Sequence, residues 1–311
     1  MLYVTKRVMW AIVTLVACSA VTFCVTFVVP ADPARTIAGP NATAETVERI
    51  RQERGLSDPI PVQYARYVAG VARGDLGKSL VGDEPVLRMI LVRLPATALL
   101  AAAAFLIWVV VGTLAGVLSA AYRNTVVDRL ALVGSIIGLS IPSFWLGVLL
   151  LWAVAHSGLS KWLPLGGAGE GFPDRLRHVI LPAIALGVGG AAFYSRVVHA
   201  HLVEVLEQDY IRTARAKGLS RARIMFRHAL RNALLPIVTL AGMDLASLLA
   251  GAVLTESVFG WPGIGHQAWL AISSSNVPVV MGTTLFSAAF VIAANLIVDL
   301  LYRLLDPRVR T

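Results

Sequence analysis

The residues best placed to do chemistry form one basic segment, which runs from Tyr210 to Ile237. It contains no Asp or Glu, and it contains seven Lys or Arg residues: Arg212, Arg215, Lys217, Arg221, Arg223, Arg227 and Arg231. Such a cluster binds anionic groups, either the headgroups of a membrane or an acidic surface on a partner protein. By charge alone, lipid binding is the simpler interpretation.

The spacing within this segment predicts two helices separated by a sharp break. The first helix should run from Asp209 to Lys217 and stop at Gly218, because glycine readily adopts the backbone conformation that ends a helix. Ser220 can cap the second helix. That helix should carry an apolar stripe of Met225, Phe226, Ala229, Leu230, Ala233 and Leu234 and a basic stripe of Arg223, Arg227 and Arg231. A lipid anchor needs no such break, so the pattern favours insertion into a groove on another protein.

Two acidic residues lie where a carboxylate needs a specific reason. Asp244 interrupts an otherwise apolar run, and a carboxylate inside a membrane must face a partner or water. It either hydrogen-bonds a neighbouring helix or lines a solute path, where it would favour a cationic group. Glu256 precedes the stretch GWPGIG, which it is expected to fix as part of an external gate segment with Gly260, Pro262 and Gly263.

Other polar motifs carry weaker signals. Ser140 and Ser143 flank Pro142 and are expected to hydrogen-bond between helices, with a place on the solute path as the alternative. The stretch GDLGKS resembles a phosphate-binding loop but lacks the glycine that this motif requires five residues before Gly77, so no ATP site is expected. The six histidines are scattered without metal-ligand spacing, and no paired catalytic carboxylates are present. We therefore expect a chain without catalytic residues, metal or cofactor of its own.

The composition is that of a membrane protein. Of the 311 residues, 57% are hydrophobic and 14% charged, whereas soluble domains are about a quarter charged. With this apolar content, the net charge of +9 favours a membrane over nucleic acid as the partner. A bilayer-spanning helix needs about 20 apolar residues. Six runs suffice, which predicts an all-α membrane protein with six transmembrane helices: Val8–Val29, 94–122, 130–160, 178–195, Leu234–Thr255 and Val277–Val298.

The first run is expected to be a retained span. It is longer than the core of a signal peptide, and no A-x-A-like cleavage site follows it. With the N-terminus in the cytoplasm, 15 of the 27 Lys and Arg residues face inward, and the two short outer loops hold three. Positive charge marks the cytoplasmic side, so both termini and the basic segment should lie inside. At the inner end of the last run, Asp299 and Arg303 have the spacing of an ion pair.

These predictions divide the chain into three parts. Residues 1–30 form the cytoplasmic N-terminus and first span, residues 31–93 an external loop, and residues 94–311 a five-helix core with a cytoplasmic loop at about 201–232. In the external loop, TAETVERIRQERGL predicts a surface helix that ends at Gly55, and DPIPVQYARYVAG predicts a second short helix. EPVLRMILVRL predicts an interfacial helix that leads into the second span.

The basic segment also carries a family resemblance. RTARAKGL followed by HALRNALLP resembles the EAA loop of ABC-importer permeases, in the version found in the dipeptide, oligopeptide and nickel branch, and most closely the B-type subunit of dipeptide permeases. The common form begins Glu-Ala-Ala and has Asp before the glycine. Here those positions are Arg212, Thr213, Ala214 and Lys217, departures that are typical of the peptide branch. Further stretches resemble the branch in family order: Gly55–Leu80, Ser140–Leu151, Ala252–Gly265 and LLDPRVR.

The resemblance implies a type I ABC importer permease fold in a bacterial plasma (inner) membrane, and a solute that is a di- or oligopeptide, a nickel chelate or a haem-like compound. It implies a second permease subunit or a copy of this chain, two cytoplasmic ATPase subunits that bind ATP and Mg, and an external solute-binding protein. It places ATPase coupling on Arg212, Thr213, Ala214, Arg215, Ala216, Lys217 and Gly218. The alternatives from other classes are an intramembrane enzyme and an ion-coupled secondary transporter. The latter needs intramembrane charges, and only Asp244 is well placed.

Overall fold

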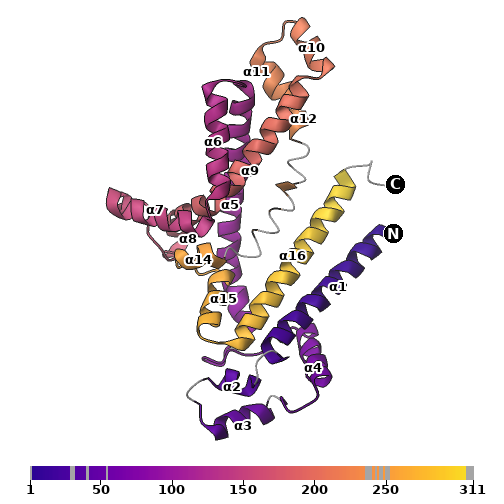
Figure 1. Cartoon of the computed structure of the whole chain (residues 1–311), viewed down its shortest axis with the longest axis vertical. Coiled ribbons are helices and arrows are strands. Elements are labelled where there is room, and N and C mark those ends of the chain that lie inside the picture. Colours follow the sequence, from indigo (N-terminus) through magenta and orange to yellow (C-terminus); the bar gives the residue numbers. More distant parts are fainter. Residues whose placement is uncertain are drawn as a thin grey trace. The chain divides into compact units, whose positions relative to one another are not determined.

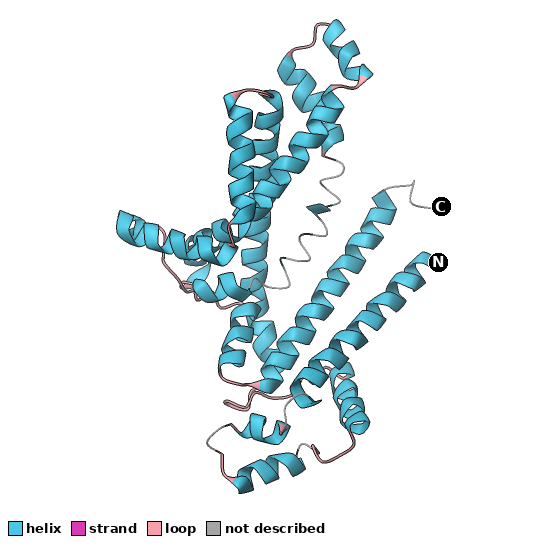
Figure 2. Ribbon diagram, viewed as in Figure 1, coloured by secondary structure: helices cyan, strands magenta, loops and turns pink. Residues whose placement is uncertain are grey.

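The computed structural model describes residues 2–28, 32–39, 42–53, 55–234, 240–241, 244, 248 and 253–305, without the side chains of 2–4, 33, 36 and 297–305. Regular structure in these residues is helical, apart from one β-bridge between Lys78 and Pro85 (Figure 1, Figure 2). The predicted all-α class is therefore confirmed.

Four described helical stretches are long and apolar enough to cross a bilayer: Thr5–Val28, Val86–Ala121, Ile180–Leu206 and Val277–Leu296. They correspond to the first, second, fourth and sixth predicted spans. Most of the predicted fifth span, Leu234–Thr255, lies outside the described residues, as do the side chains of Asp299 and Arg303. The membrane class is thus confirmed, while the count of six spans stays a prediction.

The third predicted span is not one helix. It is divided into α6 (Val126–Ser140) and α7 (Ser143–Ser157), whose axes are bent by 104°. The break follows from Pro142, which has no N–H to donate and keeps the preceding residue out of the helical conformation. Ile141 is accordingly extended, with φ −85° and ψ 121°. Each half is about 22 Å long at 1.5 Å per residue, shorter than the hydrocarbon core of a bilayer.

The chain divides into two compact units, which we describe separately. The first comprises Met1–Thr97, Leu249–Ser257 and Pro262–Thr311, and the second comprises Ala98–Leu248 and Val258–Trp261.

In the first unit, α1 (Leu2–Phe23) packs along α16 (Val277–Leu305), and α15 (Ile264–Ser273) also packs against α16. The buried side chains of Val86, Ile90, Ile264, Ala271 and Val279 form a core between α15, α16 and the start of α5 (Val86–Ala121).

The helices predicted for the external loop are present in this unit. They are α3 (Ala44–Glu53) and α4 (Ile60–Ala72), preceded by the short α2 (Pro33–Ala38). Gly55 has φ +59°, as expected of a glycine just past a helix end. The predicted interfacial helix is continuous with the second span, because α5 begins at Val86 and runs through it.

The second unit is built around α9 (Ile180–Leu206), which contacts α6, α7 and α8 (Gly171–His178). Two glycines four residues apart, Gly112 and Gly116, bring the backbones of α5 and α9 together. A Cβ atom on either glycine would collide with the carbonyl oxygen of Ala191 or Ser195 on α9. Small residues with this spacing allow close helix packing in membranes.

Candidate functional site

The basic segment forms a compact elbow, which we define as residues Asp209–Ser220. Its helix, α10 (Asp209–Ala216), ends one residue earlier than predicted, with Lys217 as the C-cap. Gly218 has φ +73°, and the Leu219 N–H donates to the Ala214 carbonyl oxygen to close the turn. A side chain at this φ is strained, so the break depends on glycine. The predicted helix and its stop at Gly218 are confirmed.

One face of α10 is anchored in the core of the second unit. Ile211 and Ala214 are 0% and 6% exposed and pack in a cluster with Leu202, Ile224 and Met225. Burying an isoleucine side chain stabilises a fold by roughly 2 kcal/mol. The rest of the elbow is largely exposed and includes the other six residues that the sequence associates with coupling: Arg212, Thr213, Arg215, Ala216, Lys217 and Gly218. Asp209 is exposed as well and pairs with Arg212 at 3.3 Å. The elbow therefore presents cations outward from a fixed apolar base.

The second half of the basic segment begins as predicted. The Ser220 side chain accepts a hydrogen bond from the Arg223 N–H at 3.4 Å, which makes it the N-cap of α11 (Arg221–Arg223). A π-helix, η3 (Ile224–Ala229), and α12 (Leu230–Ala233) follow.

The predicted apolar stripe is buried at Met225, Ala229 and Ala233 and half-buried at Leu230 and Leu234, and the π-helix corrects it at Phe226. Phe226 is 62% exposed, whereas Ile224, which the pattern left out, is 4% exposed. An i→i+5 turn is wider than an α-helical turn, so it brings Ile224 and Ala229 to the same face, and Ala233 continues that face four residues later. The basic stripe is exposed as predicted, at Arg223, Arg227 and Arg231.

Polar contacts also hold the elbow to its neighbours in the second unit. Arg123 pairs with Glu207, just before α10, at 2.8 Å. The amide of Asn232 on α12 donates to the Tyr210 hydroxyl at 2.8 Å. These contacts lie at the surface, so we expect them to orient the elbow more than to stabilise it.

A partly buried polar cluster, which we call the Ser119 cluster, joins α5, α6 and α9 in the same unit. The Ser119 hydroxyl donates to Asp128 Oδ1 at 2.6 Å and lies 2.8 Å from His199 Nδ1. The hydroxyl has a single proton, which it donates to Asp128. It therefore accepts a hydrogen bond from His199 in the tautomer that carries its hydrogen on Nδ1. The other oxygen of Asp128 accepts the Asn124 N–H at 2.9 Å. Sequence spacing gave no sign of this cluster, because its members come from three helices.

In the first unit, Glu256 is fully buried in α14 (Val253–Val258). Its Oε1 accepts the Thr97 hydroxyl at 3.0 Å, and its Oε2 accepts the His266 N–H at 2.9 Å. Thr97 in turn accepts the Ile264 N–H at 2.8 Å. Burial raises the pKa of Glu256, and these donors act in the opposite direction. We call these groups the Glu256 cluster; it ties the start of α15 to α5, as expected of a residue that fixes this loop.

The two glycines of the predicted external gate segment are required for different physical reasons. A Cβ on Gly263 would collide with the Glu256 carboxylate, so this position requires glycine for space. Gly260 has φ +57° and requires glycine for its conformation. Pro262 lies between them. The sequence did not predict Thr97 as a partner of Glu256, because there Thr97 is only a hydroxyl residue in an apolar run.

The predicted solute-path residues lie in different surroundings. The Tyr194 hydroxyl on α9 donates to Asp244 Oδ2 at 2.8 Å, which supports the interpretation of Asp244 as a partner of a neighbouring helix. Ser140 donates to the Ile136 carbonyl oxygen in its own helix at 2.8 Å, so the expectation of a bond between helices is not met there. Ser143 is half-buried at the start of α7. In the described part of the chain, no group of three or more His, Cys, Asp or Glu residues could hold a metal ion.

Comparison with known families matches almost the whole chain. Residues 112–311 match the model described as "Binding-protein-dependent transport system inner membrane component", and residues 1–101 match "Binding-prot-dependent transport system membrane comp, N-term".

Curated relatives agree with this match. The "Glutathione transport system permease protein GsiC" of Escherichia coli (strain K12) is 38% identical over 308 residues, which cover 99% of this chain and 98% of the relative. The proteins of the same name from Escherichia coli O6:H1 and Shigella dysenteriae serotype 1 have the same identity and coverage. The chain therefore belongs to the family of binding-protein-dependent transport system inner membrane components, the permeases of ABC importers.

Proposed function

We propose that this chain is the permease subunit of an ATP-driven importer for peptide-like solutes, and that the elbow couples it to an ATPase. The similarity to permeases named for glutathione, a small peptide, supports the solute class. The exposed cationic face of α10, fixed to the chain by Ile211 and Ala214, is the observation that carries the coupling role.

The proposed complex contains a second permease subunit, two cytoplasmic ATPase subunits and an external solute-binding protein. Both termini and the elbow face the cytoplasm, in line with the distribution of Lys and Arg. ATP binding and closure of the ATPases would move the elbow as a rigid piece, because its helix is packed on α9. The movement would open the path outward to receive solute, and hydrolysis would reset it. The ATPase subunits carry out the hydrolysis, and this chain takes no catalytic part.

Within this mechanism the seven coupling residues divide into two roles. Ala214 is buried in the chain's own core, so its part is to hold α10 in place. Arg212, Thr213, Arg215, Ala216, Lys217 and Gly218 are exposed and form the docking face. We assign Glu256 with Gly260, Pro262 and Gly263 to the external gate. Asp244, with Ser140 and Ser143, remains the candidate for the solute path.

The coupling proposal is tested with one charge placed at two exposed alanines. Ala216→Glu puts a carboxylate on the docking face, and Ala222→Glu puts the same group on the adjacent α11. In proteoliposomes that contain the whole transporter, Ala216→Glu should lower solute uptake at least about tenfold and abolish solute-stimulated ATP hydrolysis, because a charge forced into a close-packed interface is left unpaired. Ala222→Glu should retain both activities. Normal uptake with Ala216→Glu, or an equal loss with both variants, would contradict the assignment.

The orientation is tested separately in a chain from which Cys18 and Cys24 have been replaced. A cysteine at Ser57, which is exposed in the external loop, should react with an impermeant thiol reagent in intact cells. A cysteine at Ala222 should react only after lysis. The reverse order of labelling would place the elbow on the wrong side of the membrane for an ATPase.

A further inference from the structure

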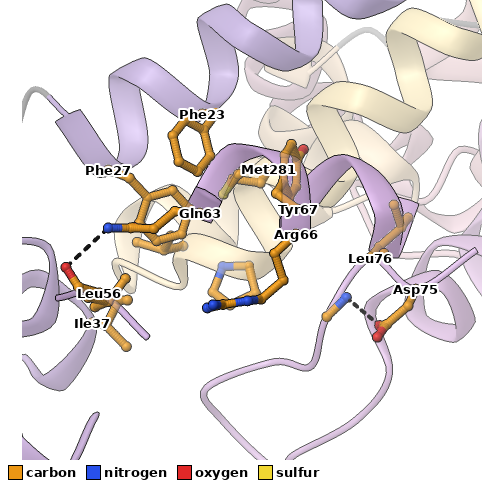
Figure 3. A pocket seen from close by; sticks show the side chains of 14 residues that line it. Phe23, Phe27, Ile37, Leu56, Gln63, Arg66, Tyr67, Asp75, Leu76 and Met281 are labelled. Atoms are coloured by element: carbon orange, nitrogen blue, oxygen red, sulfur yellow. Dashed lines mark hydrogen bonds between the residues drawn. The ribbon is translucent and has the colours of Figure 1, made fainter. Parts of the chain in front are cut away.

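The first unit contains a cavity of about 270 Å³ that the transport mechanism does not use. Its walls come from the end of α1 with the π-helix that follows it (η1, Cys24–Val28), from α2 and α4, and from the first turn of α16 (Figure 3). A smaller apolar cavity, of about 150 Å³, is enough to hold benzene. The space can therefore accept part of an organic molecule.

The position of the cavity relates it to the membrane. Phe23 and Phe27 lie at the end of the first candidate span, and Val277 and Met281 lie at the start of the last. The two helices pack side by side, so the cavity lies at a shared end of two spans. That level is the boundary between the hydrocarbon and the headgroups of a bilayer.

The residues that line the cavity change from apolar to polar across this boundary. The walls from the spans are apolar, with Phe23, Phe27 and Met281, whereas α4 and the turn after it contribute Gln63, Arg66 and Asp75. Figure 3 shows Phe23, Tyr67 and Met281 gathered together, and Arg66 and Asp75 away from them. A phospholipid has the same sequence of groups, from acyl chain through ester carbonyls to a charged headgroup.

Tyr67 supplies an unused polar group inside the cavity. Its hydroxyl is buried and has no hydrogen-bond partner among the described residues. Burial raises the pKa of Tyr67 to about 12, so the hydroxyl stays protonated at neutral pH and can donate. Tyr64, one turn earlier, is different, because its hydroxyl lies 2.8 Å from Ser19 Oγ. A buried phenol usually finds a partner, so an acceptor in the cavity would complete the site.

The other polar groups of the lining are already engaged. Gln63 donates to the carbonyl oxygens of Leu56 and Asp58, Arg66 pairs with Asp58, and Asp75 accepts the Gly77 N–H. A pocket for a polar solute needs several convergent free groups, whereas an acyl chain needs none. The observations therefore favour an amphiphile over a peptide.

We propose that this cavity binds one phospholipid, with its acyl chain among Phe23, Phe27 and Met281 and an ester carbonyl accepting from Tyr67. The phosphate then lies on the headgroup side of the cavity, where Arg66 remains paired with Asp58. The proposal rests on the membrane placement of α1 and α16 and is independent of the solute and of the ATPase.

Two variants with a matched control test the proposal. Gly70→Leu fills the cavity from within α4, where a Cβ meets only the Asp75 carbonyl oxygen at 3.4 Å. Tyr67→Phe removes the donor and keeps the shape, and Tyr64→Phe removes a neighbouring hydroxyl outside the lining. Full-length chain from nanodiscs of phosphatidylethanolamine and phosphatidylglycerol is transferred to mild detergent, and native mass spectrometry counts the lipids retained. In parallel, phosphatidylethanolamine with a diazirine in its acyl chain is photolysed and the labelled peptides are mapped.

The wild type should retain one phospholipid per chain and be labelled around Phe23 and Met281. Gly70→Leu should lose the retained lipid. Tyr67→Phe should lower retention about fivefold, the size of one hydrogen bond, while Tyr64→Phe should match the wild type. Equal retention in all variants, labelling spread evenly along α1 and α16, or displacement of the lipid by glutathione would each overturn the proposal. Thermal unfolding of each variant verifies that the comparison is made between folded chains.

Discussion

The elbow and the Glu256 cluster fix their loops by opposite means. The elbow rests on apolar side chains, Ile211, Ala214 and Ile224, and leaves its cations exposed. The Glu256 cluster buries a carboxylate completely and satisfies it with the Thr97 hydroxyl and a backbone N–H. An exposed charge remains available to a partner, whereas a buried and bonded one serves its own chain. The exposed cations fit the docking role that we propose for the elbow, whereas the Glu256 cluster fixes the shape of its own loop.

The comparison can be tested most severely at Glu256. Glu256→Ala leaves the Thr97 hydroxyl and the His266 N–H buried without their acceptor, so we expect the chain to lose about 4 kcal/mol of stability. Glu207→Ala is the control, because that carboxylate pairs with Arg123 at the surface and should cost less than about 0.5 kcal/mol. Thermal unfolding in detergent measures both variants. Equal losses of stability in the two variants would remove the distinction between the two regions.

The apolar base of the elbow should give the next largest effect. Ile224→Ala removes a buried side chain and should cost about 3 kcal/mol, with a reduced unfolding temperature. Phe226→Ala truncates a larger side chain that is 62% exposed and should cost less than about 0.5 kcal/mol. The reverse ranking would show that the segment is a regular α-helix with the stripe predicted from its sequence.

The fold of this region could be predicted where the signals are local. Gly218 and Ser220 predicted the break and the cap, and charge alone predicted exposed arginines. The π-helix could not be predicted, because its register is set by the packing of Ile224 and Met225 against other helices. The same limit holds at the gate segment, where Glu256 was recognised but Thr97, 159 residues away, was not. Which face of α10 is buried also depends on tertiary contacts, so Ala214 could not be separated from Ala216.

The Ser119 cluster, formed by Ser119, Asp128 and His199, adds a polar network of the second unit to this comparison. Ser119→Ala removes a hydrogen bond to the Asp128 carboxylate and should cost about 2 kcal/mol. Ser135→Ala is matched in burial, but its hydroxyl donates to the Leu132 carbonyl oxygen of its own helix, so it should cost less than about 0.5 kcal/mol. The difference in unfolding temperature between the two variants is the measurement. If Ser119→Ala behaved like Ser135→Ala, the cluster would contribute nothing to the joining of the three helices.

The smallest effect should come from the glycines. Gly260→Ala forces a side chain into the left-handed region at φ +57° and should cost about 1 kcal/mol. Gly134→Ala, in the middle of α6 with nothing within 4 Å of its Cβ, should stabilise the chain by up to about 1 kcal/mol. The two substitutions should therefore shift the unfolding temperature in opposite directions. A stabilising Gly260→Ala would show that this turn does not need its glycine.

The packing of α1 along α16 has a consequence for biosynthesis. During synthesis α1 is made first and α16 last, so α1 is without this packing partner until nearly the whole chain has been made. During that interval its future contact surface faces lipid or the insertion machinery. The second unit, which is almost continuous in sequence, needs no such delay, because α5 to α12 emerge together. A truncated chain that lacks α16 would therefore leave α1 with α4 but without the helix along which it packs.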